Sequence, residues 1–280
     1  MRNQVHLLAL LLVVALFLSG CAVAASPAPD QPLPELLIQA SEYAYDVPDR
    51  IEAGLTTVAL ENEGELAHHA QLARLPEGMT PEAWLGLMQE NPPAAIQAVT
   101  YVGGPGLLDP GLRQEVVLDL LPGTHLVVSF VFDAEGVPYL AKGMVKPFEV
   151  VAPSTAAKVQ PIESNGTVEL LDFSFILPAG IGAGPQVWEV VNEAQEIHEI
   201  MVLKLADGKN LHDVMAFLQT PNGEAPYVNL GGFQAITPGE SSWLKLDLEP
   251  GEYVVTCYVP GAETGDPHFA MGMIQSFTVK

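Results

Sequence analysis

The sequence predicts an all-β protein made of two tandem Greek-key β-sandwiches, each with one short helix. One pattern of turns and polar residues occurs twice, about 130 residues apart. The apolar segments are short and end at turns, and the segment 243–248 alternates apolar and polar residues as a half-buried strand does. The 25 glycines and 24 prolines exceed the average content and favour turns between short strands over long helices. Several strands and one helix in each copy fit a layered sandwich.

Matched landmarks in the same order define the repeat. An asparagine precedes a histidine by six residues in each copy, at Asn62 and His68 and again at Asn192 and His198. The other pairs are Tyr43-Ala44-Tyr45 with Phe173-Ser174-Phe175, Gly103-Gly104 with Gly231-Gly232, Pro122-Gly123 with Pro250-Gly251, and Gly143-Met144 with Gly272-Met273. We therefore expect two domains, residues 36–151 and 167–280, joined by a linker over 152–166 that contains turn-forming residues.

One helix is predicted at the same place in each copy. Thr80 can cap the first helix, which has Pro81 at its first position, and Asn210 can cap the second. Apolar residues then recur with helical spacing, at Ala83, Trp84, Leu87 and Met88 in the first helix and at Leu211, Val214, Met215 and Leu218 in the second. Each stripe can pack one face of its helix against a sheet.

The first 21 residues resemble a bacterial lipoprotein signal. Arg2 is followed by an apolar run that is too short to span a bilayer and suits the core of a signal peptide. The run ends in Ser19-Gly20-Cys21, where small residues admit a peptidase and the cysteine thiol takes a lipid. The resemblance implies a signal peptide over 1–20, a tether over 21–35, and an extracytoplasmic protein attached to a membrane through lipid on Cys21. That location is the periplasm, the outer membrane or the cell surface. An ordinary cleaved secretory signal that happens to contain a cysteine is the alternative.

Composition and charge indicate a folded, acidic protein. Of the 280 residues, 34 are Asp or Glu and 11 are Lys or Arg, so the formal net charge is −23. Such a chain repels phosphate, and nucleic-acid binding is therefore excluded. Hydrophobic residues make up 49% of the chain, which is enough to form cores and argues against disorder.

The second copy contains His198, Cys257, His268 and Met273, an order that resembles the cupredoxins, the small blue-copper proteins. Ten residues separate Cys257 from His268, and four separate His268 from Met273. The resemblance covers residues 36–280. It implies two cupredoxin-like sandwiches, with one type 1 copper bound by these four residues in the second domain. It also implies that His268 is partly exposed and passes the electrons.

The residue types suit this chemistry, although each has a structural alternative. Two imidazoles, one thiolate and a distant thioether make a site that copper accepts in both oxidation states. Taken singly, Cys257 lies beside valines and can be a buried apolar residue, and a histidine at the end of a strand is often structural. Met271 is a second candidate for the axial ligand. The ordered combination of all four residues favours copper.

The first copy has His68, Ser129, Tyr139 and Met144 at the matching positions. A serine cannot supply a thiolate, and Tyr139 stands where the second copy has an imidazole. We therefore expect the first domain to be a degenerate cupredoxin without a metal.

These patterns predict a carrier of single electrons with no catalytic residues, and hence no enzyme. Two-domain copper enzymes of similar layout need His-x-His pairs or a histidine directly before the ligand cysteine, whereas Thr256 precedes Cys257 and no His-x-His occurs. Two other functions stay open. One is a metal-free sandwich that binds or scaffolds, and the other is copper sequestration or delivery without electron transfer. The sequence does not identify a redox partner protein.

Overall fold

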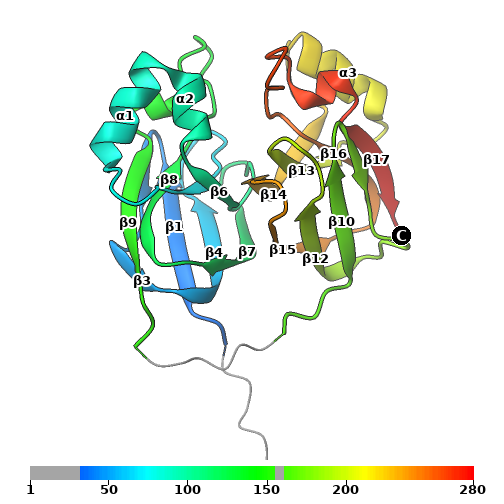
Figure 1. Ribbon diagram of the computed structural model, residues 1–280. Coiled ribbons are helices and arrows are strands. Elements are labelled where there is room, and N and C mark those ends of the chain that lie inside the picture. Colours follow the sequence, from blue (N-terminus) through cyan, green and yellow to red (C-terminus); the bar gives the residue numbers. More distant parts are fainter. Residues whose placement is uncertain (1–31, 155–160) are drawn as a thin grey trace, which may run out of the picture. The chain divides into compact units, whose positions relative to one another are not determined.

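The computed structural model describes residues 32–154 and 161–280. The predicted signal peptide, the lipidation site Cys21 and most of the predicted tether lie outside the described residues. Leu33–Lys280 forms one compact unit, in which the strands of each half carry their helices at one end (Figure 1). Within the described residues, no helix is both long and apolar enough to cross a bilayer.

The repeat is visible in the order of the strands. The first half contains β1 (Glu35–Ser41), β2 (Ala44–Asp46), β3 (Arg50–Glu52), β4 (Gly54–Asn62), β5 (Gln71–Arg74), β6 (Thr100–Gly103), β7 (Arg113–Leu120), β8 (Gly123–Val128) and β9 (Val145–Val151). The second half contains β10 (Gly166–Leu171), β11 (Ser174–Ile176), β12 (Gly184–Asn192), β13 (His198–Leu205), β14 (Tyr227–Ile236), β15 (Ser241–Leu248), β16 (Gly251–Thr256) and β17 (Ile274–Val279). In each half the first strand pairs antiparallel with the short second strand, and β1 with β4 and β10 with β12 make matching parallel pairs.

In the described residues these strands form two sheets, and each sheet runs through both halves. The eight-stranded sheet has the order β11-β10-β12-β15-β7-β4-β1-β2, and the nine-stranded sheet has the order β17-β16-β13-β14-β6-β5-β8-β9-β3. Alternate residues of a strand face the core, as Leu36, Ile38 and Ala40 of β1 show by being fully buried. One contiguous core cluster takes residues from both sheets and both halves. The prediction of all-β Greek-key sandwiches is confirmed at the level of the fold class.

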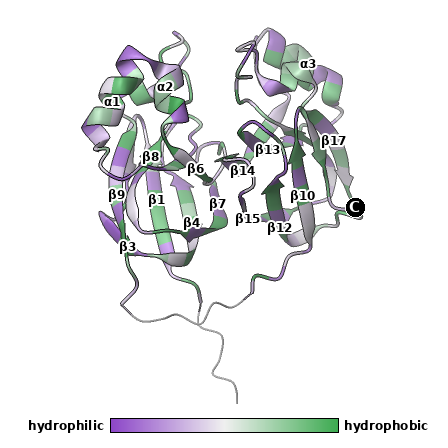
Figure 2. Cartoon of the chain, viewed as in Figure 1, coloured by the Kyte–Doolittle hydropathy of each residue, from purple (hydrophilic) through white to green (hydrophobic). Residues whose placement is uncertain are grey.

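The predicted helix caps are present. Thr80 accepts a hydrogen bond from the Ala83 N–H at 3.2 Å and starts α1 (Pro81–Glu90). Asn210 starts α3 (Leu211–Gln219) and forms a capping box with Asp213. Figure 2 shows hydrophobic and hydrophilic residues on all the helices, and the buried Trp84 and Val214 lie on the inner faces of α1 and α3.

Within residues 32–154 the first half carries two α-helices, α1 and α2 (Pro92–Gln97), whereas the sequence predicted a single helix there. The prediction of one helix in this half is therefore wrong. Asn91 ends α1 and also caps α2, because its side chain accepts a hydrogen bond from the Ala94 N–H at 3.2 Å. The indole N–H of Trp84 donates to the Ala95 carbonyl at 3.0 Å and holds the two helices together.

Two strand pairs cross the seam between the halves, β7 with β15 and β6 with β14, and isolated bridges join Pro105 to Phe233 and Leu108 to Leu230. At this seam the Gln234 N–H donates to the Gly104 carbonyl at 2.8 Å, and the Gly106 N–H donates to the Gly232 carbonyl at 3.1 Å. Gly232 has φ +136°, and a Cβ there would lie 2.1 Å from the Ile200 carbonyl oxygen. The repeated double glycines therefore allow neighbouring backbones to approach more closely than any side chain would permit.

Buried histidines in the first half make the stability of the fold sensitive to acid. His125 of β8 is fully buried, its Nδ1 lies 3.1 Å from the Gly123 carbonyl oxygen, and burial lowers its pKa to about 4. The unfolded chain therefore takes up this proton more readily than the folded protein. The stabilisation is complete above about pH 6.5 and is lost as the pH falls from there towards 4.

We predict that the free energy of unfolding falls by about 3 kcal/mol between pH 7 and pH 4 through His125 alone. Urea unfolding at a series of pH values, on the wild type and on His125→Gln, measures this contribution. The variant should show a shallower pH dependence between 6.5 and 4, whatever its stability at pH 7. Parallel curves for the two proteins would contradict the prediction.

Candidate metal centre

His198 is the first residue of β13 and is fixed by the turn before it. The side chain of Asn192, six residues earlier, donates to the carbonyls of Glu196 and Ile236, both at 2.9 Å. The same side chain accepts from the Ala194 N–H at 3.0 Å. This amide closes the turn with three hydrogen bonds, so the spacing from asparagine to histidine fixes where the imidazole enters the core. His198 is fully buried.

Backbone hydrogen bonds close the loop that carries Cys257, His268 and Met273. Cys257 follows β16; its N–H donates to the Met273 carbonyl at 3.1 Å, and its carbonyl accepts from the Phe269 N–H at 2.9 Å. His268 begins a short 3-10 helix, His268–Met271, and its N–H donates to the Val259 carbonyl at 2.9 Å. The Met273 N–H donates to the His268 carbonyl at 2.9 Å. All three backbones are thus tied to one another.

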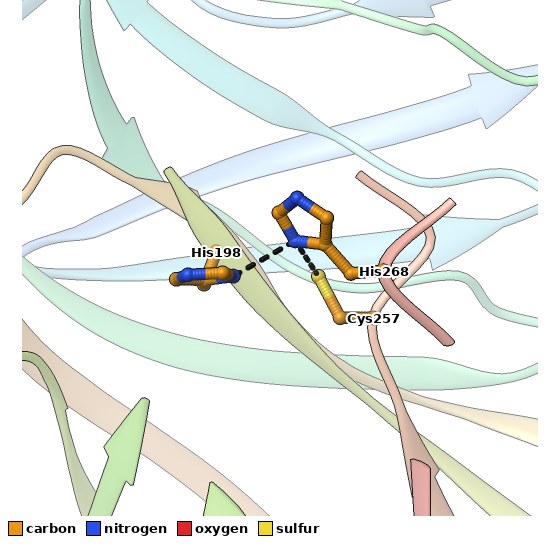
Figure 3. A group of neighbouring side chains, drawn as sticks. All are labelled: His198, Cys257 and His268. Carbon is orange, nitrogen blue, oxygen red and sulfur yellow. Dashed lines mark hydrogen bonds between the residues drawn. The ribbon is translucent and has the colours of Figure 1, made fainter. Parts of the chain in front are cut away.

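The structure brings three of the four predicted ligands together, as Figure 3 shows. The Nδ1 atoms of His198 and His268 lie 2.9 Å apart, and the Cys257 Sγ lies 3.4 Å from the His268 Nδ1. The ligand atoms of the three buried residues all lie within 4.8 Å of one another. Imidazole and thiolate bind first-row metal ions at about 2.0–2.3 Å, so donors around one ion lie about 3–4 Å apart. The observed spacing suits a single small ion.

Burial keeps the three groups uncharged when nothing is bound. It lowers the pKa of both histidines and raises that of the Cys257 thiol well above its usual range. The neighbouring His268 lowers the His198 pKa further, and the Glu199 carboxylate adds to the rise at Cys257. A bound cation reverses this preference for the thiol alone, because a coordinating thiol is deprotonated outright, and it keeps both imidazoles neutral.

Carboxylates lie on the outer side of both rings. The Asp172 Oδ1 is 3.4 Å from the His198 Nε2, and the Glu196 Oε2 is 3.4 Å from the His268 Nε2. A carboxylate at Nε2 favours the proton on that nitrogen and leaves the Nδ1 lone pair free to bind a metal. Both lone pairs then point at each other across 2.9 Å, an arrangement that a cation between them would stabilise. The donor set therefore fits a metal ion, and two imidazoles with one thiolate suit copper.

Met273 and Met271 differ in their surroundings. Met273 is fully buried and its backbone is bonded to both Cys257 and His268. Met271 is half-buried, and its Sδ lies 3.8 Å from the Thr264 hydroxyl, to which it is a hydrogen-bond acceptor.

The first half repeats this backbone arrangement with other side chains. The Ser129 N–H donates to the Met144 carbonyl at 3.1 Å, and the Met144 N–H donates to the Tyr139 carbonyl at 3.0 Å. The ring of Tyr139 lies against that of His68, with centroids 5.6 Å apart. Serine and tyrosine thus occupy the positions of the thiolate and of one imidazole, so this half lacks those two donors of the second.

One expectation about the site is wrong. The resemblance implied a partly exposed His268, whereas its side chain is fully buried. Phe173 packs edge-on against the rings of His268 and His198, with centroids 5.1 and 6.3 Å away. Glu196 lies at the outer nitrogen of His268. Together these two side chains cover the imidazole that we expected at the surface.

Sequence reasoning missed the roles of three residues around the site. Phe173 was visible only as an aromatic landmark of the repeat, and its φ of +62° is unusual for a bulky residue. Its counterpart Tyr43 has φ +61° and packs on Tyr139 in the same edge-on way. Asp172 and Glu196 gave no signal among many acidic residues, because nothing in the sequence alone places them at the rings.

No family model and no curated protein matches the sequence. Among solved structures, an auracyanin from Roseiflexus castenholzii is 18% identical over 43% of this chain and 99% of its own, with a TM-score of 0.31. Auracyanin A from Chloroflexus aurantiacus, described as a "blue" copper protein, is 15% identical over 41% of this chain and 98% of its own, with a TM-score of 0.28. A copper-containing nitrite reductase from Thermus scotoductus is 12% identical over 88% of this chain and 61% of its own, with a TM-score of 0.25. With TM-scores this low, the conclusions about this chain rest on its own geometry.

Proposed function

We propose that the protein binds one copper ion through His198, Cys257, His268 and Met273 and transfers single electrons. The observation that carries this proposal is the convergence of two imidazole nitrogens and one thiol sulfur in the core of the second half. Copper in such a site supplies a one-electron couple between its two common oxidation states. The chain's part is to hold the donors so that they hardly move.

The backbone around the site supports that role. Backbone hydrogen bonds link the ligand loop to itself, among them the four described above, and the turn of Asn192 fixes His198. Each donor is therefore held by the fold, with or without an ion. Little rearrangement is needed when the charge of the site changes, which favours rapid electron transfer.

Burial of the donors argues against copper delivery, and their convergence argues against a metal-free scaffold. The three ligand side chains are buried, so a site built from them gives a substrate no direct access, which favours electron transfer over catalysis. The same closure favours retention of copper over its release to another protein. A metal-free scaffold has no need for two imidazoles and a thiol that face one another.

We further propose that the chain is attached to a membrane outside the cytoplasm through a lipid on Cys21. The lipoprotein-like sequence around this residue supports the proposal. The wild type should partition with membranes and carry a diacyl modification on its N-terminal peptide by mass spectrometry. Cys21→Ser should lose both properties. Equal membrane association of the two proteins would contradict a lipid anchor on this residue.

Cys257→Ser should abolish the blue site. With one equivalent of Cu(II), the wild type should show an intense visible band from thiolate-to-copper charge transfer and narrow copper hyperfine splitting. The variant should lack the band and bind copper more than about 100-fold more weakly, since outer partners of ligands alone contribute about 10–100-fold. Ser129→Ala alters the matching position of the first half and is the control. A colourless wild type, or equal spectra for wild type and Cys257→Ser, would contradict the proposal.

Met273→Leu should keep the visible band and raise the reduction potential. A weakly bound thioether donates electron density to the ion and stabilises its oxidised state, so its loss favours the reduced state. Met271→Leu is the matched control, because Met271 faces Thr264, and its potential should stay at the wild-type value. Voltammetry measures both. A shift in Met271→Leu but not in Met273→Leu would assign the axial position to Met271.

A further inference from the structure

Glu196 connects the ligand loop to one of the ligand rings. Its Oε2 accepts a hydrogen bond from the Ala262 N–H at 3.0 Å and lies 3.4 Å from the His268 Nε2. Its backbone carbonyl accepts from the Asn192 side chain at 2.9 Å, which fixes the start of the side chain. One carboxylate oxygen is therefore held between the loop 258–267 and the outer nitrogen of His268.

The repeat separates this contact from the general needs of the fold. Leu66 is the counterpart of Glu196, because its carbonyl accepts from the Asn62 side chain at 2.8 Å in the same way. The backbone role is thus kept in the first half, while the carboxylate is replaced by an apolar side chain. The ring at the position of His268 is there Tyr139, which has no outer nitrogen. The carboxylate of Glu196 is therefore present in the half that has the imidazole of His268 and absent from the corresponding position of the half that has Tyr139.

Asp172, the other carboxylate near the rings, is not specific to the second half. It accepts from the Gln195 N–H at 3.2 Å. Its counterpart Glu42 contacts the N–H groups of Glu65 and Leu66 in the half without the ligand set. An acidic residue at this position therefore serves the turn and lies beside a histidine in both halves, Glu42 at His68 and Asp172 at His198. Glu196 is the carboxylate that is specific to the half with the candidate metal centre.

We propose that Glu196 is a positioning residue for His268. It holds the imidazole with its proton on Nε2, so that Nδ1 faces His198 and Cys257, and its charge favours the more positive, oxidised state of a bound copper. This inference rests on the proposed copper site. Neither role requires Glu196 to touch the ion.

The test compares Glu196→Gln and Glu196→Leu with the matched control Glu263→Gln. Glu263 is an exposed acidic residue in the same loop, so the control removes the same charge from the loop. Glutamine can still accept the hydrogen bond from the Ala262 N–H, whereas leucine is the residue that the first half has at this position, Leu66. We expect Glu196→Gln to keep the visible band and to lower the ratio of Cu(II) to Cu(I) affinity about tenfold. A tenfold change for one electron corresponds to a rise in potential of about 59 mV.

Equal potentials for Glu196→Gln and Glu263→Gln would overturn the electrostatic role.

A second readout does not need copper: nitrogen NMR of the metal-free protein at pH 8 reports which nitrogen of His268 carries the proton. The wild type should carry it on Nε2, and Glu196→Leu should show a mixture, with urea midpoints recorded to detect any loss of folding. A wild-type proton on Nδ1 would overturn the positioning role. A wild type that binds no copper but keeps the proton on Nε2 would refute the proposed function and the electrostatic role, and would leave the positioning role standing.

Discussion

The ligand loop depends on one constraint: three polar groups must stay together in a dry core with few hydrogen bonds among themselves. With both imidazole protons on Nε2, only the Cys257 thiol can donate within the cluster, to the His268 Nδ1 at 3.4 Å, and burial removes the water that would otherwise bind the other groups. The backbone must therefore hold them. It does so through the bonds from Cys257 to Met273 and from Met273 to His268. Because Ser129, Tyr139 and Met144 keep the same bonds in the first half, this loop conformation does not require the side chains of Cys257 and His268.

The first half supports the site through the seam. Ile236 of β14 lies opposite His198 of β13 on one side and opposite Val102 of β6 on the other. Its carbonyl also accepts from the Asn192 side chain that fixes the turn before His198. One residue therefore links the first half, the turn and the first ligand. A half that lacks the thiolate and the second imidazole can still limit the movement of the half that has them, because interiors are close-packed and transmit strain.

The sequence predicted the parts of this arrangement that follow from local rules. Caps at Thr80 and Asn210 depend on residues two or three positions away. The ligand order His198, Cys257, His268 was readable because each residue ends or begins a turn-bounded strand or loop. The second helix α2 was missed because Asn91 both ends one helix and starts the next, which looks like a single interruption. The burial of His268 depends on Phe173 and Glu196, which lie far from it in the sequence, and no periodicity connects them.

Under the proposed function, an electron would not enter directly through His268, as the resemblance implied, because other side chains cover this imidazole. With the imidazole buried, a partner protein meets the side chains around it first: Phe173 at the ring edges and Glu196 at the outer nitrogen. A carboxylate at this point repels acidic groups and favours a partner with a basic contact surface, an effect that weakens as ionic strength rises. Under the proposed function, the same carboxylate would stabilise positive charge at the site, so it would oppose reduction while it attracts the partner. A site closed in this way would combine a lower potential with selective approach, and both properties would come from Glu196, where the first half has Leu66.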